Sequence, residues 1–524
     1  MQKHNMRTEK KSSIKNSATR LVLIALLVLI QTGWMVFLML KLNAYSTAIT
    51  LALTFIAVFI ALKIFGTHVN SAQRMPWLIV ITAVPFFGIC IYLLFGRSIV
   101  TKGMRRRFNG IESDILVNKL SQDETVIDEI AAKDKGIANQ CRYISHTARY
   151  PVYKNTDVEY YAEADISFAA QIEELKKAEH FIFMEYHAIE DALSFERLKK
   201  VLIEKAQSGV EVRIFYDDLG SIFFLNKEFI KRMREQGIQC RVFNPLKVVV
   251  NMFMNNRDHR KITVIDGRVG FTGGYNLADE YFNITHPYGY WKDTGIKLTG
   301  DAVRSLTASF LTMWNAIDHT DSQADYDKYL DAADNTYKAV DSECYVQPYS
   351  DNPLGQDRIG EDVYLNILKN ANDYVYITTP YLIITDEMER ELRLAVKRGV
   401  DVRIVTPGIP DKKMVYKITR SYYEPLCSAG VRIYEYTPGF CHAKQWVSDD
   451  EVSVVGTINM DFRSLYLHFE NAVFTYNKGL AAKVKKDMLN NFEAGREVTK
   501  DYAKDVIRPL KLGTCILRMI SPLL

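Results

Sequence analysis

The chain has few cysteines, and none of them forms a pattern typical of a metal site or a disulfide scaffold. No two have the C-x-x-C spacing of a zinc site, and their scatter argues against a disulfide framework. The H-E-x-x-H zinc motif and the Walker lysine loop are also absent. The sequence therefore predicts no metal and no cofactor. The 524 residues contain seven cysteines: Cys90, Cys141, Cys240, Cys344, Cys427, Cys441 and Cys515.

A large excess of one charge is also lacking. The formal net charge is +4, which gives no global polycation and predicts no nucleic-acid partner. The Asp-rich stretch 318–343 lacks the Gly and Glu of an EF-hand loop, so a calcium site there is not predicted.

Long apolar runs, in contrast, open the chain. The stretches 21–40, 44–64 and 77–95 each have the length of a membrane-spanning helix. A cleaved signal peptide would explain only the first of them, and three buried core helices are the less favoured alternative. Residues 1–110 are therefore predicted to be a membrane region with a basic tail and N-terminal transmembrane helices.

The orientation of this region stays open. Basic residues precede the first apolar stretch and follow the third, and both groups prefer the cytoplasm. Three full spans cannot satisfy both, so the third stretch, which contains Pro85, is a candidate for a re-entrant or interfacial segment. Alternatively, the second basic group binds anionic headgroups. The flank after residue 95 favours a cytoplasmic catalytic domain.

The rest of the chain alternates strand and helix signals, and it does so twice. Strand-like 181–186 and 210–216 enclose a helical pattern at 195–207, and 374–381 and 399–405 enclose another at 387–397. This predicts one α/β domain duplicated, over 111–320 and 344–500, with a linker at 321–343. The end, 501–524, is apolar with spaced cations and either lies on a membrane surface or docks on the core.

Each half carries the motif H-x-K-x-x-x-x-D. About 0.05 chance matches are expected in a chain of this composition, so two are significant. Both are followed at the same distance by an asparagine, Asn276 in the first half and Asn459 in the second. The motif residues are His259, Lys261 and Asp266 in the first half, and His442, Lys444 and Asp449 in the second.

These side chains are suited to a phosphodiester. One imidazole can attack phosphorus while the other protonates the leaving oxygen. Lys261 and Lys444 would hold the non-bridging oxygens, helped by the two asparagine amides. Asp266 and Asp449 either orient the site or form turns. Two half-motifs predict one pseudo-symmetric site at the junction of the halves.

The paired motifs resemble the phospholipase D superfamily over residues 155–500. Tyr290-Trp291-Lys-Asp293, Thr379-Pro380-Tyr381 and the stretch 456–464 are similar to bacterial cardiolipin synthases. The resemblance implies duplicated phospholipase D-like α-β-α domains with a pseudo-two-fold site. It also implies a multi-pass enzyme of the bacterial cell membrane that joins two phosphatidylglycerol molecules to cardiolipin and glycerol at an anionic bilayer. It further implies that His259 is the nucleophile and His442 the acid.

Some residues near the motifs are open to more than one interpretation. Glu470 is predicted to orient a catalytic histidine by a hydrogen bond, with Glu280 as its weaker counterpart. His468 stands where the family commonly has Asn, and a third catalytic base there is not favoured. His187 is interpreted as structural.

Other functions share these motifs. Water or another alcohol such as serine could be the acceptor, which would make the protein a hydrolase or a different phosphatidyltransferase. A nuclease would need a basic groove, and the apolar spans would be superfluous. A non-enzymatic membrane binding module is disfavoured because both motifs are intact.

Overall fold

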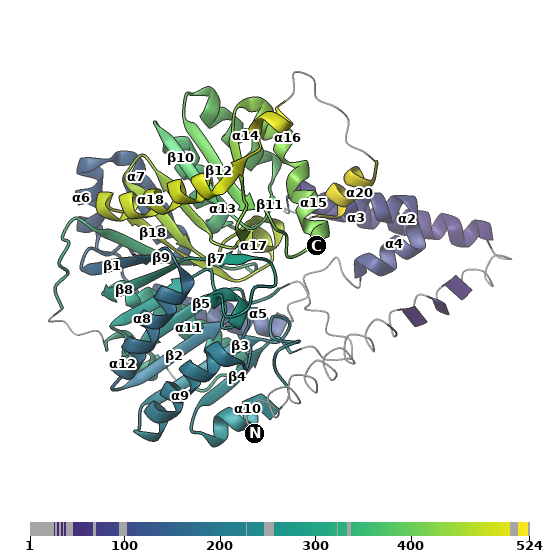
Figure 1. The fold of residues 1–524 in the computed structure, drawn as a ribbon. Helices are drawn as coiled ribbons and strands as arrows, with labels where there is room; N and C mark the ends of the chain where they lie inside the picture. Colours follow the sequence, from purple (N-terminus) through teal and green to yellow (C-terminus); the bar gives the residue numbers. More distant parts are fainter. Residues whose placement is uncertain are drawn as a thin grey trace.

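The computed structural model describes residues 46–66, 70–93, 102–226, 228–245, 256–321, 323–332, 337–503 and 512–521, with a few positions between 26 and 37. Two α/β halves lie against each other, and the N-terminal helices and the last helix extend to one side (Figure 1). Most of the predicted stretch 21–40 lies outside the described residues.

The first half is built on a mixed sheet with the order β1-β8-β6-β5-β2-β3-β4. Strands β2, β3 and β4 are parallel, as the predicted β-α-β unit requires, and β5 turns antiparallel to β2. The strands are β1 (Thr156–Tyr161), β2 (Phe181–Tyr186), β3 (Glu211–Asp217), β4 (Gln239–Phe243), β5 (Lys261–Ile265), β6 (Val269–Gly273) and β8 (Gly295–Gly300).

The second sheet repeats this order, read from its other edge, as β9-β18-β16-β15-β10-β12-β13, with β19 added at the end. Strands β5 and β15, which follow the two histidines, therefore occupy equivalent central positions. The strands are β9 (Tyr345–Asp351), β10 (Tyr374–Thr378), β12 (Asp401–Pro407), β13 (Arg432–Tyr436), β15 (Gln445–Ser448), β16 (Val452–Gly456), β18 (Glu470–Tyr476) and β19 (Gly495–Glu497). Two short pairs stand apart, β7 (Tyr290–Lys292) with β14 (Gly439–Cys441) and β11 (Leu382–Ile383) with β17 (Met460–Asp461).

Helices cover both faces of each sheet, so strands β2 and β10 are buried along their whole length. On one face of the first sheet Phe183 stacks on Phe310 of α11, with ring centroids 4.5 Å apart. The helices of the first half are α5 (Lys102–Glu112), α6 (Glu124–Lys133), α7 (Lys135–Tyr143), α8 (Ala164–Lys176), α9 (Leu193–Gln207), α10 (Glu228–Glu235), α11 (Val303–Ile317) and α12 (Gln323–Leu330). Short η-helices follow α5, α7 and β6: η3 (Ser113–Val117), η4 (Ile144–Ala148) and η5 (Asp279–Phe282).

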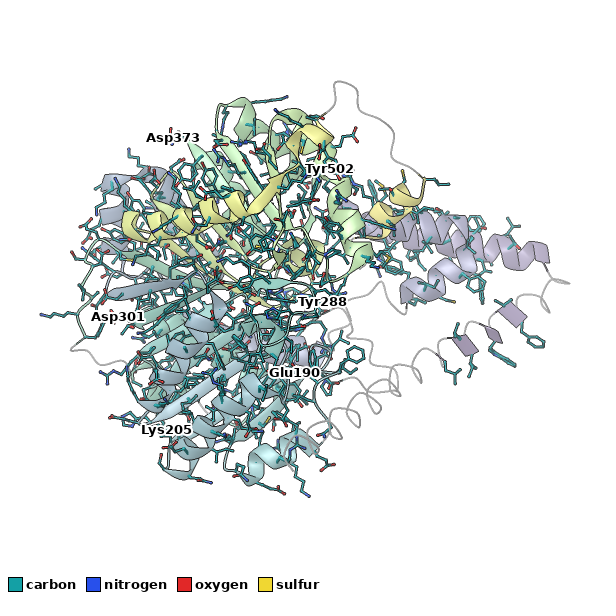
Figure 2. The ribbon with its side chains drawn as sticks, viewed as in Figure 1. Glu190, Lys205, Tyr288, Asp301, Asp373 and Tyr502 are labelled. Carbon is teal, nitrogen blue, oxygen red and sulfur yellow. The ribbon has the colours of Figure 1, made fainter. Side chains whose placement is uncertain are left out.

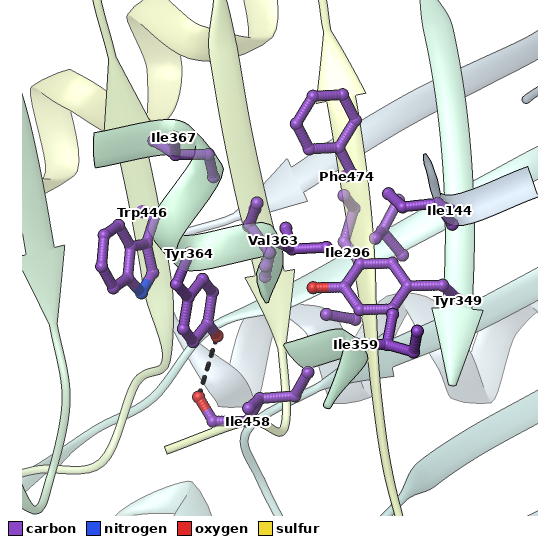
Figure 3. Close-up of a cluster of buried hydrophobic side chains, with 14 of the residues drawn as sticks. Ile144, Ile296, Tyr349, Ile359, Val363, Tyr364, Ile367, Trp446, Ile458 and Phe474 are labelled. Carbon is purple, nitrogen blue, oxygen red and sulfur yellow. Dashed lines mark hydrogen bonds between the residues drawn. The ribbon is translucent and has the colours of Figure 1, made fainter. Parts of the chain in front are cut away.

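The second half contributes α13 (Ile359–Asn370), α14 (Asp386–Lys397), α15 (Lys413–Ser421), α16 (Tyr423–Ala429), α17 (Phe462–Tyr466), α18 (Lys478–Ala494), α19 (Thr499–Tyr502) and α20 (Leu512–Ile520). Its core supports strand β15 directly. Trp446 stacks on Tyr364 of α13, with ring centroids 4.3 Å apart, and the Tyr364 hydroxyl donates to the Ile458 carbonyl (Figure 3). Ile296 of the first half enters the same cluster. One continuous core therefore fixes β15 and joins the two halves.

The N-terminal apolar stretches form α2 (Ser46–Phe65), α3 (Ser71–Ala83) and α4 (Pro85–Ile91). The apolar stretch 77–95 is not one continuous helix, because within its described residues the helix breaks at Val84. Pro85 lacks a backbone N–H and disfavours helical geometry in the residue before it. Gly88 then lets α4 pack back on α3, since a Cβ there would lie 2.4 Å from the Val80 carbonyl. Within the described residues, no helix combines the length and apolarity needed to cross a membrane.

Candidate active site

The two motif histidines lie immediately before β5 and β15, where the halves exchange backbone hydrogen bonds. The His259 amide donates to the Phe469 carbonyl at 2.9 Å, and the His442 amide donates to the Lys292 carbonyl at 2.7 Å. Each histidine is thus held by the segment of the other half that precedes an acidic residue. Tyr288, labelled in Figure 2, packs near the β7–β14 pair at this junction.

Each imidazole is held by a carboxylate from the opposite half. Nδ1 of His259 lies 3.0 Å from Glu470 Oε2, and Nδ1 of His442 lies 2.7 Å from Asp293 Oδ2. Both carboxylates are fully buried. An Nδ1–H that donates to a carboxylate leaves Nε2 as the free basic nitrogen, so each ring presents Nε2 for chemistry.

The motif lysines are buried beside their histidines. Nζ of Lys261 donates to the His259 carbonyl at 2.6 Å, and Nζ of Lys444 donates to the His442 carbonyl and lies 2.8 Å from its Nδ1. Burial lowers the pKa of Lys261 to about 8 and that of Lys444 to about 7. Two ammonium groups held away from water form a site that favours an anion.

Burial, followed by the nearby lysines, also keeps both histidines neutral. The pKa of His442 falls to about 3 through burial and Lys444, against the opposing pull of Asp293. The pKa of His259 falls well below its usual value through burial and Lys261, and Lys444 and His442 of the other half lower it further. Because groups of each half act on the histidine of the other, the two motifs form one site.

The two asparagines are not equivalent. Asn276 accepts from the Ala188 amide at 3.1 Å and donates to the Tyr281 hydroxyl at 2.9 Å, which ties it to the first half. Asn459 is buried, and its Oδ1 has no hydrogen-bond partner among the described residues. Of the two amide oxygens, that of Asn459 is therefore the one without a hydrogen bond among the described residues.

Of the two roles that the sequence left open for Asp266 and Asp449, their contacts fit the formation of turns. Asp266 lies at the far end of β5 from His259, about 20 Å away at the rise of a strand. Its carboxylate accepts from the amides of residues 179–181, and Asp449 accepts in the same way from the amides of residues 372–374. Both aspartates have positive φ, 52° in each case. They hold the start of the neighbouring strand and form turns.

Glu280 is not the counterpart of Glu470, and Asp293 takes that place. Glu280 is partly exposed beside Tyr281, whereas Asp293 lies just before β8 and Glu470 is the first residue of the equivalent strand β18. Asp293 follows Asn276 by 17 residues in the first half, whereas Glu470 follows Asn459 by 11 residues in the second. Because the two loops differ in length, sequence spacing does not show that Asp293 and Glu470 are equivalent. An acidic residue at or just before the strand that follows the motif hairpin is the sequence signal that could have shown it.

Other rings surround the two histidines. His187 and His468 approach His259, with ring centroids 5.0 and 5.5 Å away, while Trp291 packs 5.3 Å from His442. Nitrogens of His259 and His468 and an oxygen of Glu470 lie within 4.8 Å of one another. In geometry these three could hold a metal ion, but the Nδ1 atoms that face Glu470 are suited to donate hydrogen bonds to it.

Comparison with known proteins is consistent with this geometry. A family model described as "Cardiolipin synthase, PLD-like domain" matches residues 171–314 and 364–492, and one described as "Phospholipase_D-nuclease N-terminal" matches residues 52–97. The cardiolipin synthase of Geobacillus thermodenitrificans is 33% identical over 92% of this chain and 94% of its own length. An uncharacterised protein of Streptococcus mutans is 39% identical over 88% of this chain and 99% of its own length.

The fold also has a solved counterpart. The phosphatidylserine synthase of Haemophilus influenzae superposes with a TM-score of 0.52 at 14% identity, covering 70% of this chain and 93% of that one. Together with the family model, which matches more than half of the residues, these relatives establish the classification. The chain is an enzyme of the phosphatidyltransferase type and belongs to the cardiolipin synthase family of the phospholipase D superfamily.

Proposed function

We propose that the enzyme transfers the phosphatidyl group of one phosphatidylglycerol to a hydroxyl of a second, forming cardiolipin and releasing glycerol. The observation that carries this is the pair of imidazoles whose Nδ1 atoms face carboxylates of the opposite half. Two neutral rings beside two buried lysines suit a double displacement at phosphorus.

In the first displacement, Nε2 of His259 attacks phosphorus and forms an N–P bond. The P–O bond to the glycerol headgroup breaks, and His442 gives its Nε2 proton to the departing oxygen. Lys261 and Lys444 balance the charge on the non-bridging oxygens. The empty site keeps His442 neutral, so Nε2 of His442 must take up a proton from solution when the phosphodiester anion binds. The charge of the anion offsets the repulsion from Lys444, which otherwise lowers the pKa of His442.

In the second displacement, a hydroxyl of another phosphatidylglycerol attacks the phosphohistidine. His442, now neutral, takes the hydroxyl proton, the N–P bond breaks and His259 is restored. The same two imidazoles act in both steps, so atoms and protons balance over the cycle.

We also propose that the enzyme meets its lipid at a membrane through the N-terminal helices, as a multi-pass protein of the cell membrane. Helix α2 exposes large apolar side chains, including Phe55 and Phe59, which are 74% and 69% exposed. Helix α20 packs on α3 and α15, on the same side of the molecule as α2 (Figure 1), and its Leu512 is exposed. The hairpin of α3 and α4 fits a re-entrant segment, and Arg105–Arg107 of α5 fit anionic headgroups on the cytoplasmic side.

A product analysis tests the reaction. The purified protein is placed in vesicles of phosphatidylglycerol labelled in its headgroup, and lipids and released glycerol are measured. One cardiolipin for each glycerol is expected, with EDTA causing no loss. Phosphatidic acid in place of cardiolipin would indicate hydrolysis, and added serine or another alcohol captured in the lipid product would indicate a different acceptor.

Single variants test the roles of the residues. His259→Ala and His442→Ala should each lower turnover by about 10³-fold or more, whereas His146→Ala, at an exposed histidine, serves as the matched control. Rapid denaturation in detergent at alkaline pH, where the N–P bond survives, should trap a phosphatidyl group on His259, and an adduct on His442 would reverse the two roles. Resistance of the protein to alkaline carbonate extraction tests membrane insertion.

A further inference from the structure

The surroundings of the two catalytic histidines differ at one pseudo-symmetric position. Trp291 stands two residues before Asp293, and His468 stands two residues before Glu470. Each packs its ring against the histidine that the following acid holds, Trp291 against His442 and His468 against His259. Indole carries its only donor at Nε1, which makes no hydrogen bond among the described residues. Imidazole has two nitrogens that can interact.

The tautomer of His468 is fixed by its neighbour. Nε of Arg463 donates to Nε2 of His468 at 3.2 Å. A guanidinium can only donate, so Nε2 of His468 accepts and the ring proton resides on Nδ1. His468 is mostly buried, and burial lowers its pKa well below the usual value, so the ring stays neutral with this tautomer.

The proton on Nδ1 of His468 points to the carboxylate that serves His259. Nδ1 lies 3.6 Å from Glu470 Oε1, slightly longer than a hydrogen bond, and has no other partner among the described residues. Contacts of this kind are often long in empty sites and shorten when substrate binds. Glu470 also accepts from the Thr457 hydroxyl. Glu470 is therefore surrounded by donors: Thr457, His259 and His468.

We infer that His468 is a positioning residue that shares the Glu470 carboxylate with His259 and so assigns the nucleophile's part to His259. This rests on the proposed double displacement. A second imidazole N–H on the carboxylate stabilises its charge and weakens its hold on a proton at His259. Nε2 of His259 then stays unprotonated and available to attack. Asp293 has no such imidazole, and Trp291 in its place leaves the full pull of that carboxylate on His442, the proposed acid.

The charged and titratable groups around His259 and His468 also affect the protonation of these two rings. Lys261, Lys444 and His187 surround His259 from the other packed elements and are common to all variants below. Those acting on His259 are His187, Lys261, His442, Lys444 and Glu470, and those acting on His468 are Glu470, Arg463 and His259.

The test compares two substitutions at one position in the full-length protein. His468→Phe keeps a ring but removes the donor, whereas His468→Asn places an amide N–H near the position of Nδ1. Cardiolipin formation is followed from pH 5 to 9 in phosphatidylglycerol vesicles. His468→Phe should move the acidic limb of the rate profile upward by about one pH unit, because the carboxylate then holds the His259 proton more tightly. His468→Asn should restore the wild-type limb.

A second readout is the lipid adduct on His259 after reaction at pH 6 and rapid denaturation in alkaline detergent, which should fall several-fold in His468→Phe and return in His468→Asn. His146→Phe, the same change at an exposed histidine, controls for the substitution itself. Equal profiles for the two His468 variants, shifted or not, would overturn the inference and leave the proposed reaction intact. Cardiolipin formed by wild type without any trapped adduct would instead overturn the covalent route.

Discussion

At the residue scale, the crossed carboxylates make the clearest prediction. Asp293→Asn leaves an amide beside His442 that can present the wrong atom to Nδ1 and cannot stabilise the protonated ring. Turnover should fall by about 10²- to 10⁴-fold with unchanged circular dichroism. Steady-state kinetics on vesicles measures this, with Glu280→Gln as the matched control. An equal loss in the control would contradict the assignment of Asp293.

The motif aspartates carry a different expectation. Asp266→Asn removes the charge that three backbone amides share, so the free energy of unfolding should drop by about 1–3 kcal/mol. Activity per folded molecule should stay within twofold of wild type. Denaturant unfolding and the specific activity of the folded fraction separate the two effects, and a large loss of turnover without a loss of stability would restore the catalytic interpretation.

The buried lysines predict proton uptake on anion binding. Lys444, with a pKa lowered to about 7, and Lys261, with one lowered to about 8, are partly uncharged in the empty site at pH 8. An oxyanion favours their charged forms and raises both pKa values, so binding must draw protons from solution. Calorimetry of orthovanadate binding at pH 8, in buffers of different ionisation enthalpy, measures this. Near pH 5.5, where both lysines are already charged, uptake should fall to the single proton that His442 gains on anion binding, and proton release at pH 8 would contradict the charge balance.

Some site residues could be predicted from the sequence, and others could not. The spacing of His259, Lys261, His442 and Lys444 predicted that these side chains share one site, and the structure brings them together. Residues at the edge of one short strand keep a fixed offset in the sequence. Asp266 and Asp449 share that offset for a structural reason, and spacing alone cannot separate the two causes. Asp293 was missed since its distance from the motif depends on a loop whose length differs between the halves.

At the element scale, the β7–β14 pair carries the geometry of the second histidine. Gly439 pairs with Tyr290, and a Cβ at Gly439 would lie 2.1 Å from the Tyr290 carbonyl oxygen. Gly439→Val should therefore separate the strands, displace His442 and lower turnover at least tenfold, together with the melting temperature. Gly110→Ala, where a Cβ meets nothing within 4 Å, is the control, and unchanged kinetics in Gly439→Val would show that the pair does not position His442.

The regular elements followed their patterns closely. Strand β2 spans Phe181–Tyr186 as predicted, and the predicted helix 387–397 is α14, Asp386–Lys397. Both are long or apolar enough for periodicity to identify them. Hydropathy cannot detect the break at Val84, because the apolar run continues through it. That break comes from Pro85 and from the close packing that Gly88 allows.

At the scale of the whole molecule, each half supplies the carboxylate that orients the histidine of the other half. Mixing the His259→Ala and His442→Ala proteins should therefore restore no activity, since each chain closes one defective site within its own core. Cardiolipin synthesis by the mixture, compared with each variant alone, measures this. Recovery towards a quarter or more of wild-type turnover would indicate that sites form between chains.

The crossed arrangement also bears on how such a chain can arise. A single, unduplicated half would carry a histidine and a lysine but would keep its acid out of reach of its own imidazole. Such an ancestor could have acted only as a pair of identical chains, each lending its carboxylate to the other. In one fused chain the two acids can differ, and here they do, as Glu470 with His468 beside it and Asp293 with Trp291 beside it.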